Sequence, residues 1–193
     1  MTEVLRIALT VASAFEASGL RYLVGGSLAS SFAGEPRSTL DIDFVIELPE
    51  NRIVELAARL GDDFYFEAED ARRAVRAGSC VNAIHQPTGI KVDLFVAHSS
   101  LDARQLNRRR RIRVGARPEE QLFIYTPEDI VLQKLRWYRL GGESSDRQWR
   151  DIMGVLIAQG DRLDRAYLAH EAGLLGVTDL WERATGAAGG RSG

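Results

Sequence analysis

Two aspartates that stand two positions apart, Asp41 and Asp43, are the first residues whose spacing could do chemistry. In an extended strand, side chains at this spacing leave the same face, with Cα atoms about 7 Å apart. Two carboxylates aimed at one point repel each other unless a cation lies between them, and oxygen-rich sites of this kind suit Mg²⁺ with bound phosphate. An isolated Asp-x-Asp pair is more often a solvated strand face, so other residues must support the assignment.

A turn of small residues, Gly25-Gly26-Ser27, lies upstream of the two aspartates. The glycines allow a sharp change of direction, and we expect Ser27 to cap a helix whose free N–H groups and dipole attract phosphate. The same turn is also a common structural device. It is therefore a candidate phosphate-binding turn only in combination with the carboxylates.

A third carboxylate, Asp93, lies in the middle of an apolar strand candidate, residues 90–96. An acid among apolar strand residues costs free energy unless it is paired or binds a metal ion. The structural alternative is a salt bridge to an arginine. Asp93 thus becomes a third candidate metal ligand.

The hydrophobic pattern predicts the elements that must position these residues. Apolar residues recur at helical spacing in residues 4–15, and strict alternation in residues 41–48 indicates a strand with one apolar face. Thr126 and Pro127 are typical of a capped helix start. Further predicted helices cover residues 27–34, 49–60, 68–77, 101–107, 127–140, 148–158 and two segments within 162–185, and further predicted strands cover residues 21–24, 79–85, 90–96, 111–114 and 122–125.

This order of elements predicts an α+β fold, in which helices flank a mixed β-sheet and the C-terminal part is helical. We expect residues 1–125 to form a catalytic core and residues 126–185 a helical part that packs on it. Residues 186–193 are rich in glycine, alanine and serine and are predicted to form a flexible tail.

The combination of strand, Gly-Gly-Ser turn, helix, Asp-x-Asp strand and a later strand aspartate resembles the DNA polymerase beta-type nucleotidyltransferase superfamily. The resemblance covers about residues 22–155. Within the superfamily the sequence is most similar to the bacterial group of abortive-infection and toxin-antitoxin nucleotidyltransferases, with small antibiotic-modifying relatives. It implies a nucleotidyltransferase-like fold and Mg²⁺-dependent transfer of a nucleoside monophosphate from an NTP to an acceptor.

The resemblance also implies roles for the residues of the turn and the strands. The turn, Gly25, Gly26 and Ser27, would hold the triphosphate. Asp41 and Asp43 would bind two Mg²⁺ ions, and Asp93 would complete one metal site and help to deprotonate the acceptor hydroxyl.

Two residues in the C-terminal part also match the superfamily pattern. Lys134 corresponds to a lysine that follows a similar capped helix start and would contact the triphosphate, and Asp151 corresponds to a later acid of undefined role. The sequence itself places Lys134 four residues after Ile130, on one helix face. A lysine on such a stripe is expected to reach a charged partner rather than to extend into solvent.

The composition limits the kinds of binding partner and the cellular compartment that we expect for this chain. With 25 basic and 27 acidic residues, the net charge of −2 gives no general electrostatic reason for tight nucleic-acid binding. The single cysteine, Cys80, excludes an internal disulfide, and its apolar neighbours predict a buried, inert thiol. Charged residues interrupt the apolar stretch near the N terminus, and no segment is apolar enough to cross a membrane. We therefore expect a cytoplasmic location.

Several other residues have two readings. Arg108–Arg111 with Arg113 form a basic run that could guide RNA, but charges of this kind more often protect an exposed edge strand. Trp137 and Tyr138 could stack on a base, but on an apolar helix they are more often core residues. The histidines lack the spacing of metal ligands.

The acceptor and the partners stay open at this point. RNA, tRNA or protein could accept the nucleotide, and an antitoxin could be a partner. One alternative is a catalytically idle fold that binds a nucleotide or a partner protein, although the three carboxylates argue against it. Another is an adenylyltransferase that modifies an antibiotic, with an acceptor pocket that Glu67, Glu69 and Asp70 could line.

Overall fold

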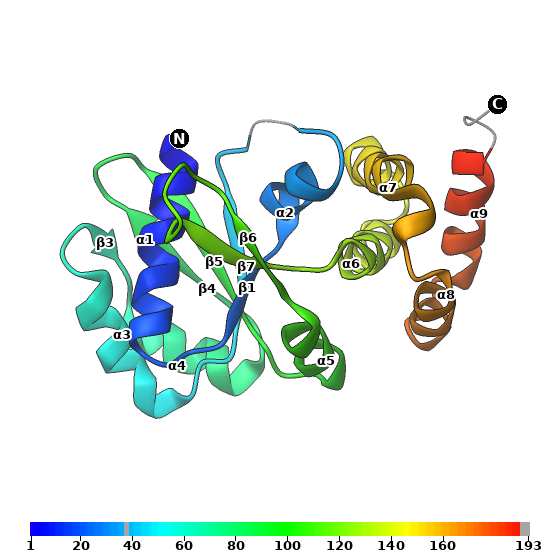
Figure 1. The fold of residues 1–193 in the computed structure, drawn as a ribbon. Coiled ribbons are helices and arrows are strands. Elements are labelled where there is room, and N and C mark those ends of the chain that lie inside the picture. Colours follow the sequence, from blue (N-terminus) through cyan, green and yellow to red (C-terminus); the bar gives the residue numbers. More distant parts are fainter. Residues whose placement is uncertain (37–38, 190–193) are drawn as a thin grey trace. The chain divides into compact units, whose positions relative to one another are not determined.

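The computed structural model describes residues 1–36 and 39–189 of the chain (Figure 1). Contacts divide the chain into two units, which are described separately. The first unit consists of Met1–Leu28 and Ser38–Tyr125, and the second of Ala29–Arg37 and Thr126–Gly193. The sequence placed a boundary at the same point, after residue 125, but did not indicate that residues 29–37 group with the C-terminal helices.

The first unit is built on a mixed β-sheet. Among the described residues the sheet has seven strands, in the order β3-β4-β5-β2-β1-β7-β6. β2 runs parallel to β5 and β1 runs parallel to β7, whereas the other neighbours are antiparallel. The strands are β1 (Tyr22–Val24), β2 (Ile42–Ile46), β3 (Phe64–Tyr65), β4 (Cys80–His85), β5 (Ile90–Val96), β6 (Arg110–Arg113) and β7 (Gln121–Ile124).

One face of this sheet is apolar and carries the core of the first unit. The alternation in β2 points Ile42, Phe44 and Ile46 to this face, where all three are fully buried. Helices α1 (Glu3–Ala17), α3 (Ile53–Leu60) and α4 (Ala68–Ala77) cover the face, and α5 (Ser100–Arg108) lies on the other side of the sheet (Figure 1). The rings of Phe15 and Phe44 meet edge to face, with centroids 5.1 Å apart.

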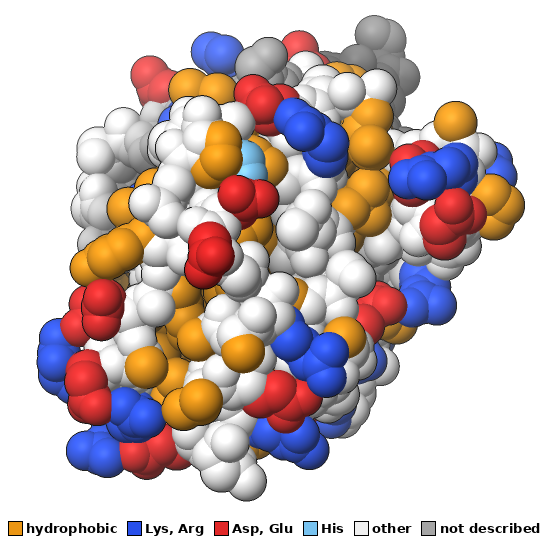
Figure 2. All heavy atoms as spheres, turned by 90° about the vertical axis from the view of Figure 1, so that its left-hand side faces the viewer, with side chains coloured by type: hydrophobic (Ala, Val, Ile, Leu, Met, Phe, Trp, Pro, Cys, Tyr) orange, Lys and Arg blue, Asp and Glu red, His pale blue; other side chains and the backbone are white. Residues whose placement is uncertain are grey.

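The outer surface of these core-covering helices carries charges of both signs. Figure 2, which faces the α1, α3 and α4 side, shows basic and acidic side chains interspersed with small apolar areas. Several of them pair, as Arg52 does with Glu55 at 2.6 Å and Arg76 with Glu50 at 2.5 Å. Among the described residues, the charges on this face therefore form no basic patch of the kind that binds a phosphate backbone.

The predicted basic run occupies the edge of the sheet. β6 is the last strand in the order, and Arg110, Arg111 and Arg113 are exposed on it. Arg111 forms an ion pair with Glu16 at 3.3 Å, and its guanidinium lies 4.7 Å from the centre of the Phe123 ring. Charged side chains on an edge strand discourage pairing with another chain. These arginines therefore lie on an edge strand, as the edge-strand reading expected, and their role stays a prediction.

The second unit is helical, as the sequence predicted. It contains Ala29–Arg37 together with α6 (Pro127–Leu140), α7 (Asp146–Gln159), α8 (Arg165–Leu174) and α9 (Thr178–Gly189). The hydroxyl of Thr126 accepts a hydrogen bond from the Asp129 N–H and caps α6. The segment that follows residue 28 packs closely on α7, because a Cβ atom at Gly34 would lie only 2.8 Å from the backbone of Gly154.

Two expectations differ from the structure of this unit. Residues 186–189 belong to α9 rather than to a flexible tail, and residues 190–193 lie outside the described residues. Trp137 is half exposed and is not a core residue, whereas Tyr138 is buried beside Trp149. None of the helices in the described ranges combines the length and the apolar character needed to span a membrane.

Candidate functional site

The glycine turn is hydrogen-bonded to the strand that carries Asp43. The N–H of Gly25 donates a 2.8 Å hydrogen bond to the backbone oxygen of Asp43. Gly26 adopts a left-handed conformation with φ of 56°, and a Cβ atom at this position would overlap the carboxylate of Asp43. The turn therefore requires glycine at residue 26 for two reasons, its backbone conformation and the approach of this carboxylate.

Ser27 lies within the first turn of the following helix and not ahead of it as predicted. Helix α2 runs from Gly26 to Ala33, so Ser27 lies inside its first turn, where it is buried. The helix begins earlier because the left-handed Gly26 turns the chain directly into it. The role of Gly25, Gly26 and Ser27 in binding triphosphate stays a prediction.

Asp43 and Asp93 lie opposite each other on neighbouring strands. In the parallel pairing of β2 with β5, Asp43 and Asp93 are registered partners, about 4.8 Å apart in the direction between strands. They belong to the face opposite Ile42 and Phe44, because neighbouring residues of a strand alternate between faces. The sheet thus brings together two carboxylates that are 50 positions apart in the sequence.

Asp93 is the more enclosed of the two and has two polar partners. The side-chain amide of Asn82, the registered partner of Asp93 on β4, donates a hydrogen bond to its Oδ1 atom. Nζ of Lys91 lies 2.9 Å from its Oδ2 atom. The pKa of Lys91 is raised by the hydrogen bond to Asp93 and by the negative charges of Asp93 and Asp41. The buried acid is therefore paired with a lysine, where the sequence suggested an arginine.

Asp41 lies outside the strand. The predicted strand over residues 41–48 is shorter, Ile42–Ile46, and Asp41 precedes it as an exposed residue. The hydroxyl of Thr39 both donates to the backbone oxygen of Asp41 and accepts from its N–H, at 3.2 and 3.3 Å. This local turn competes with the sheet ladder and delays the start of β2.

The three aspartates provide the right type of ligand for Mg²⁺. Carboxylate oxygens are hard ligands, and the bare Cα of Gly26 leaves room for the Asp43 carboxylate beside the helix start. Within the ranges 1–36 and 39–189, no three acidic, histidine or cysteine side chains are gathered closely enough to form a ready metal cluster. Binding of metal by Asp41, Asp43 and Asp93 stays a prediction.

Lys134 has a charged partner inside the second unit. Its Nζ atom lies 2.7 Å from Oδ2 of Asp151 on α7, and the side chains are only 8% and 6% exposed. The sequence predicted that Lys134 reaches a charged partner, and it connected both residues to the superfamily pattern, but it did not pair them. A contact of Lys134 with triphosphate stays a prediction.

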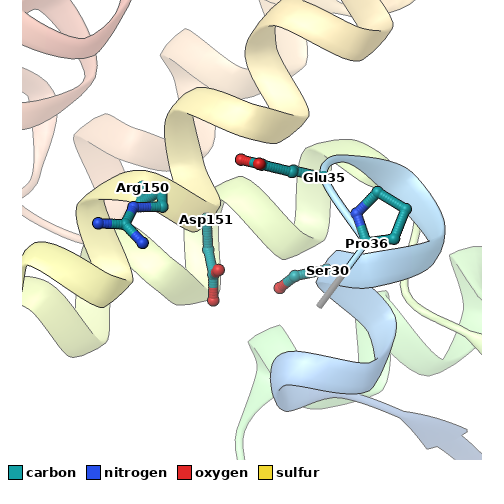
Figure 3. A pocket seen from close by; sticks show the side chains of 5 residues that line it. All are labelled: Ser30, Glu35, Pro36, Arg150 and Asp151. Atoms are coloured by element: carbon teal, nitrogen blue, oxygen red, sulfur yellow. The ribbon is translucent and has the colours of Figure 1, made fainter. Parts of the chain in front are cut away.

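A small pocket opens next to this ion pair. Ser30, Glu35, Pro36, Arg150 and Asp151 line it, and the side chains of Ser30 and Asp151 point toward each other (Figure 3). Its volume of about 80 Å³ suits a few water molecules, whereas ligand pockets of proteins usually exceed roughly 300 Å³. This pocket is therefore too small to enclose an NTP.

The residues suggested for an antibiotic-binding pocket are surface residues of α4. Glu69 and Asp70 form ion pairs with Arg72 and Arg73 along the same helix, and Glu67 precedes the helix at its N-cap. All of these pairs are at least partly exposed. Their arrangement is that of a solvated helix surface.

Cys80 is exposed and not buried as predicted, because it lies on the polar face of the sheet, at the start of β4. Partial desolvation of the thiol, followed by the negative charge of Asp93, raises its pKa to about 11. A raised pKa favours the protonated thiol near neutral pH and so disfavours reaction as a thiolate, and the low reactivity of Cys80 stays a prediction.

This thiol provides a first testable prediction. Replacing Asp93 by asparagine removes a negative charge that disfavours the thiolate, so the pKa of Cys80 should fall and its alkylation at pH 8 should accelerate about threefold to tenfold. The rate of reaction with iodoacetamide between pH 7 and 10 measures the change. The variant Cys80→Ser serves as the blank, and identical rate profiles with and without Asp93 would show that its charge does not reach the thiol.

A second prediction concerns the close approach of Gly26 to Asp43. We expect Gly26→Ala to destabilise the protein by about 1–3 kcal/mol more than Gly19→Ala, because the added Cβ must displace the Asp43 carboxylate. Gly19 is a matched control, since its φ is 65° and nothing lies within 4 Å of its added Cβ. Urea unfolding measures both variants. Adding Asp43→Ala to Gly26→Ala should recover most of the excess loss, and equal losses at the two glycines would contradict the overlap.

Comparisons with known proteins agree on the fold. No family model and no curated protein matches the sequence. Among solved structures, the chain is similar to the antibiotic-resistance factor ANT(2'')-Ia in complex with adenylyl-2''-tobramycin, with a TM-score of 0.56, 13% identity and coverage of 88% of this chain and 97% of that one. It is also similar to an antigenic nucleotidyltransferase-like protein from Paracoccidioides brasiliensis, with a TM-score of 0.54, 17% identity and coverage of 80% and 74%.

A solution structure of ANT(2'')-Ia is similar as well, with a TM-score of 0.51 and 13% identity over 97% of this chain and 96% of that one. At these identities the likeness concerns the fold and not the activity or the substrate. The α+β fold of the chain is that of solved nucleotidyltransferases.

Proposed function

We propose that the chain is a Mg²⁺-dependent nucleotidyltransferase, which transfers a nucleoside monophosphate from an NTP to a hydroxyl group of an acceptor. One observation carries the proposal: the glycine turn after β1, Asp43 at the start of β2 and Asp93 on β5 lie next to one another on central strands of the sheet. Gly26 touches the carboxylate of Asp43, and Asp43 is registered with Asp93. A phosphate-binding turn beside two carboxylates is the arrangement that the transfer requires.

The chain's own residues would divide the work between binding and proton transfer. The backbone N–H groups at the start of α2 would hold phosphate oxygens, because a helix N-terminus attracts negative charge. Asp41, Asp43 and Asp93 would hold Mg²⁺, which supplies positive charge that neutralises the triphosphate and the leaving pyrophosphate. Most of the catalysis would then come from positioning and charge neutralisation.

The reaction forms one bond and breaks one bond at the α-phosphorus. The acceptor oxygen bonds to this phosphorus, and the bond to the oxygen that bridges the α- and β-phosphates breaks, so pyrophosphate leaves. Asp93 would receive the proton of the acceptor hydroxyl, which requires that hydroxyl to bind within hydrogen-bond reach of the carboxylate. The partly enclosed position of Asp93 beside Asn82 would hold the carboxylate in one orientation.

The acceptor defines the finer function. We propose RNA, tRNA or a protein as acceptor, in keeping with the resemblance to toxin-antitoxin nucleotidyltransferases, and an antitoxin-like protein as a partner that regulates the enzyme. An aminoglycoside is the second candidate, because ANT(2'')-Ia, whose fold is similar, forms a complex with adenylyl-2''-tobramycin. The mixed charge of the helix-covered face gives no preference for nucleic acid there.

A labelling experiment tests the proposal. The purified chain is incubated with each α-³²P-labelled NTP, Mg²⁺ and either total tRNA, a protein extract or an aminoglycoside panel. Label should move to one class of acceptor and pyrophosphate should appear, and EDTA should stop both. Absence of transfer and of pyrophosphate with all four NTPs and all acceptors would favour the idle, binding-only fold instead.

A further inference from the structure

Lysine is rare in this chain and is placed only beside aspartate. Of the 25 basic residues, 23 are arginine, and the two lysines are Lys91 and Lys134. Each forms an ion pair with an aspartate, Lys91 with Asp93 and Lys134 with Asp151. An arginine binds a carboxylate with a rigid, two-pronged fork, whereas a lysine is a compact charge on a flexible stem. The choice of lysine at position 91 thus favours a contact that can be broken.

The position of Lys91 is that of a cation at the carboxylate site. Its Nζ atom lies 2.9 Å from Oδ2 of Asp93, and the charge of Asp41 also acts on it. The opposite oxygen of Asp93 is occupied by the amide of Asn82, so the oxygen that Lys91 contacts is the one open to another ligand. The side chain of Lys91 is 47% exposed and can therefore swing into solvent without leaving a cavity.

We propose that Lys91 is a resident counter-ion of the carboxylate site, which neutralises Asp93 and Asp41 until a divalent cation binds and displaces it. The inference rests on the proposed function, since it concerns how the site takes up Mg²⁺. The ammonium group offsets the charge of Asp93, which would otherwise repel the neighbouring carboxylate of Asp43. Asn82 keeps its hydrogen bond to the other oxygen of Asp93, so the carboxylate retains its orientation during the exchange.

Competition between Lys91 and Mg²⁺ has a direct consequence for affinity. Lys91→Met removes the competing charge and keeps most of the apolar stem, so Mg²⁺ should bind about fivefold to tenfold more tightly than to the wild-type chain. Lys91→Arg keeps a charge in place and should bind Mg²⁺ no more tightly than wild type. Calorimetric titration with Mg²⁺, without NTP, measures all three proteins.

A second measurement observes the displacement in the wild-type chain. With lysine labelled with ¹³C and ¹⁵N, NMR shows two lysine side chains, and Lys91→Met identifies the signal of Lys91. Addition of Mg²⁺ should shift the Lys91 signal toward that of a solvated lysine and leave the Lys134 signal in place. This readout does not depend on enzymatic activity or on the stability of a variant.

The outcomes separate this inference from the proposed function. Weaker Mg²⁺ binding by Lys91→Met, or a Lys91 signal that stays in place as Mg²⁺ saturates the protein, overturns the inference while NTP turnover still supports the function. Displacement of Lys91 in a chain without NTP turnover overturns the function alone. A wild-type chain that binds no Mg²⁺ in the absence of NTP overturns the inference and leaves the proposed function to the labelling experiment.

Discussion

NTP turnover should fall by about 10³-fold or more, roughly 4 kcal/mol of transition-state stabilisation, when Asp43 is replaced by asparagine. The substitution keeps the size of the side chain and removes one negative charge from the proposed metal site. Asp43 is the residue that the glycine turn approaches and that the sheet registers with Asp93. Loss of this charge would weaken the binding of Mg²⁺ at the place where it must contact the triphosphate.

The fold should survive this change. Asparagine fits beside Gly26 as aspartate does, and loss of one carboxylate relieves repulsion with Asp93, so the free energy of unfolding should stay within about 1 kcal/mol or rise. Circular dichroism and thermal melting without Mg²⁺ check this.

Asp62→Asn is a matched control for Asp43→Asn, because Asp62 is an exposed residue in a turn and the chemical change is identical. It should retain wild-type turnover. Full turnover in folded Asp43→Asn protein would remove Asp43 from the active site.

The elements that carry the candidate site could be predicted because their patterns are local. The alternation of Ile42, Phe44 and Ile46 determines both the strand and the face on which Asp43 lies. The turn over residues 86–89 predicts a hairpin of β4 and β5, and both strands were found at the expected positions. The capped start at Thr126 likewise gives the first turn of α6.

Which side chains pair within the site was harder to predict from the sequence. Lys91 stands two residues before Asp93 on one strand, so the sequence already places both on one face. The partner role of Asn82 follows from the hairpin register, which depends on how many residues the turn contains. These two signals were present in the sequence but become decisive only when the register is known.

Other features depend on contacts that no local pattern encodes. The two-residue strand β3 is too short for alternation to indicate, and it exists because Phe64 and Tyr65 pair with the far edge of β4. The packing of residues 29–34 on α7 depends on the bare Cα of Gly34, where a side chain would strike Gly154. Long-range contacts of this kind involve residues that are far apart in the sequence.

The largest effect on stability is expected at the buried ion pair of Lys134 and Asp151. Asp151→Ala removes the carboxylate that neutralises a buried ammonium, so unfolding should become easier by about 3–5 kcal/mol. Urea unfolding measures the loss. The exposed pair of Arg139 and Asp179 provides a control, because Asp179→Ala removes a partner that is 68% exposed and should cost far less stability than Asp151→Ala. Equal losses at the two sites would contradict a structural role for the buried pair.

The same pair separates the structural role of Lys134 from its predicted contact with triphosphate. In Lys134→Ala the Asp151 carboxylate would stay buried without the ammonium group that neutralises it. Lost activity in this variant could therefore reflect a damaged fold. The double variant Lys134→Met with Asp151→Leu replaces both charges with apolar groups of similar size and should regain most of the stability lost in the single variants. If Lys134 contacts phosphate, this folded variant should lose about 10²–10³-fold in kcat/KM for NTP, as expected for one preorganised electrostatic contact. Wild-type kcat/KM in the double variant would leave Lys134 with a purely structural role, because neither the charge nor its partner would then be needed for turnover.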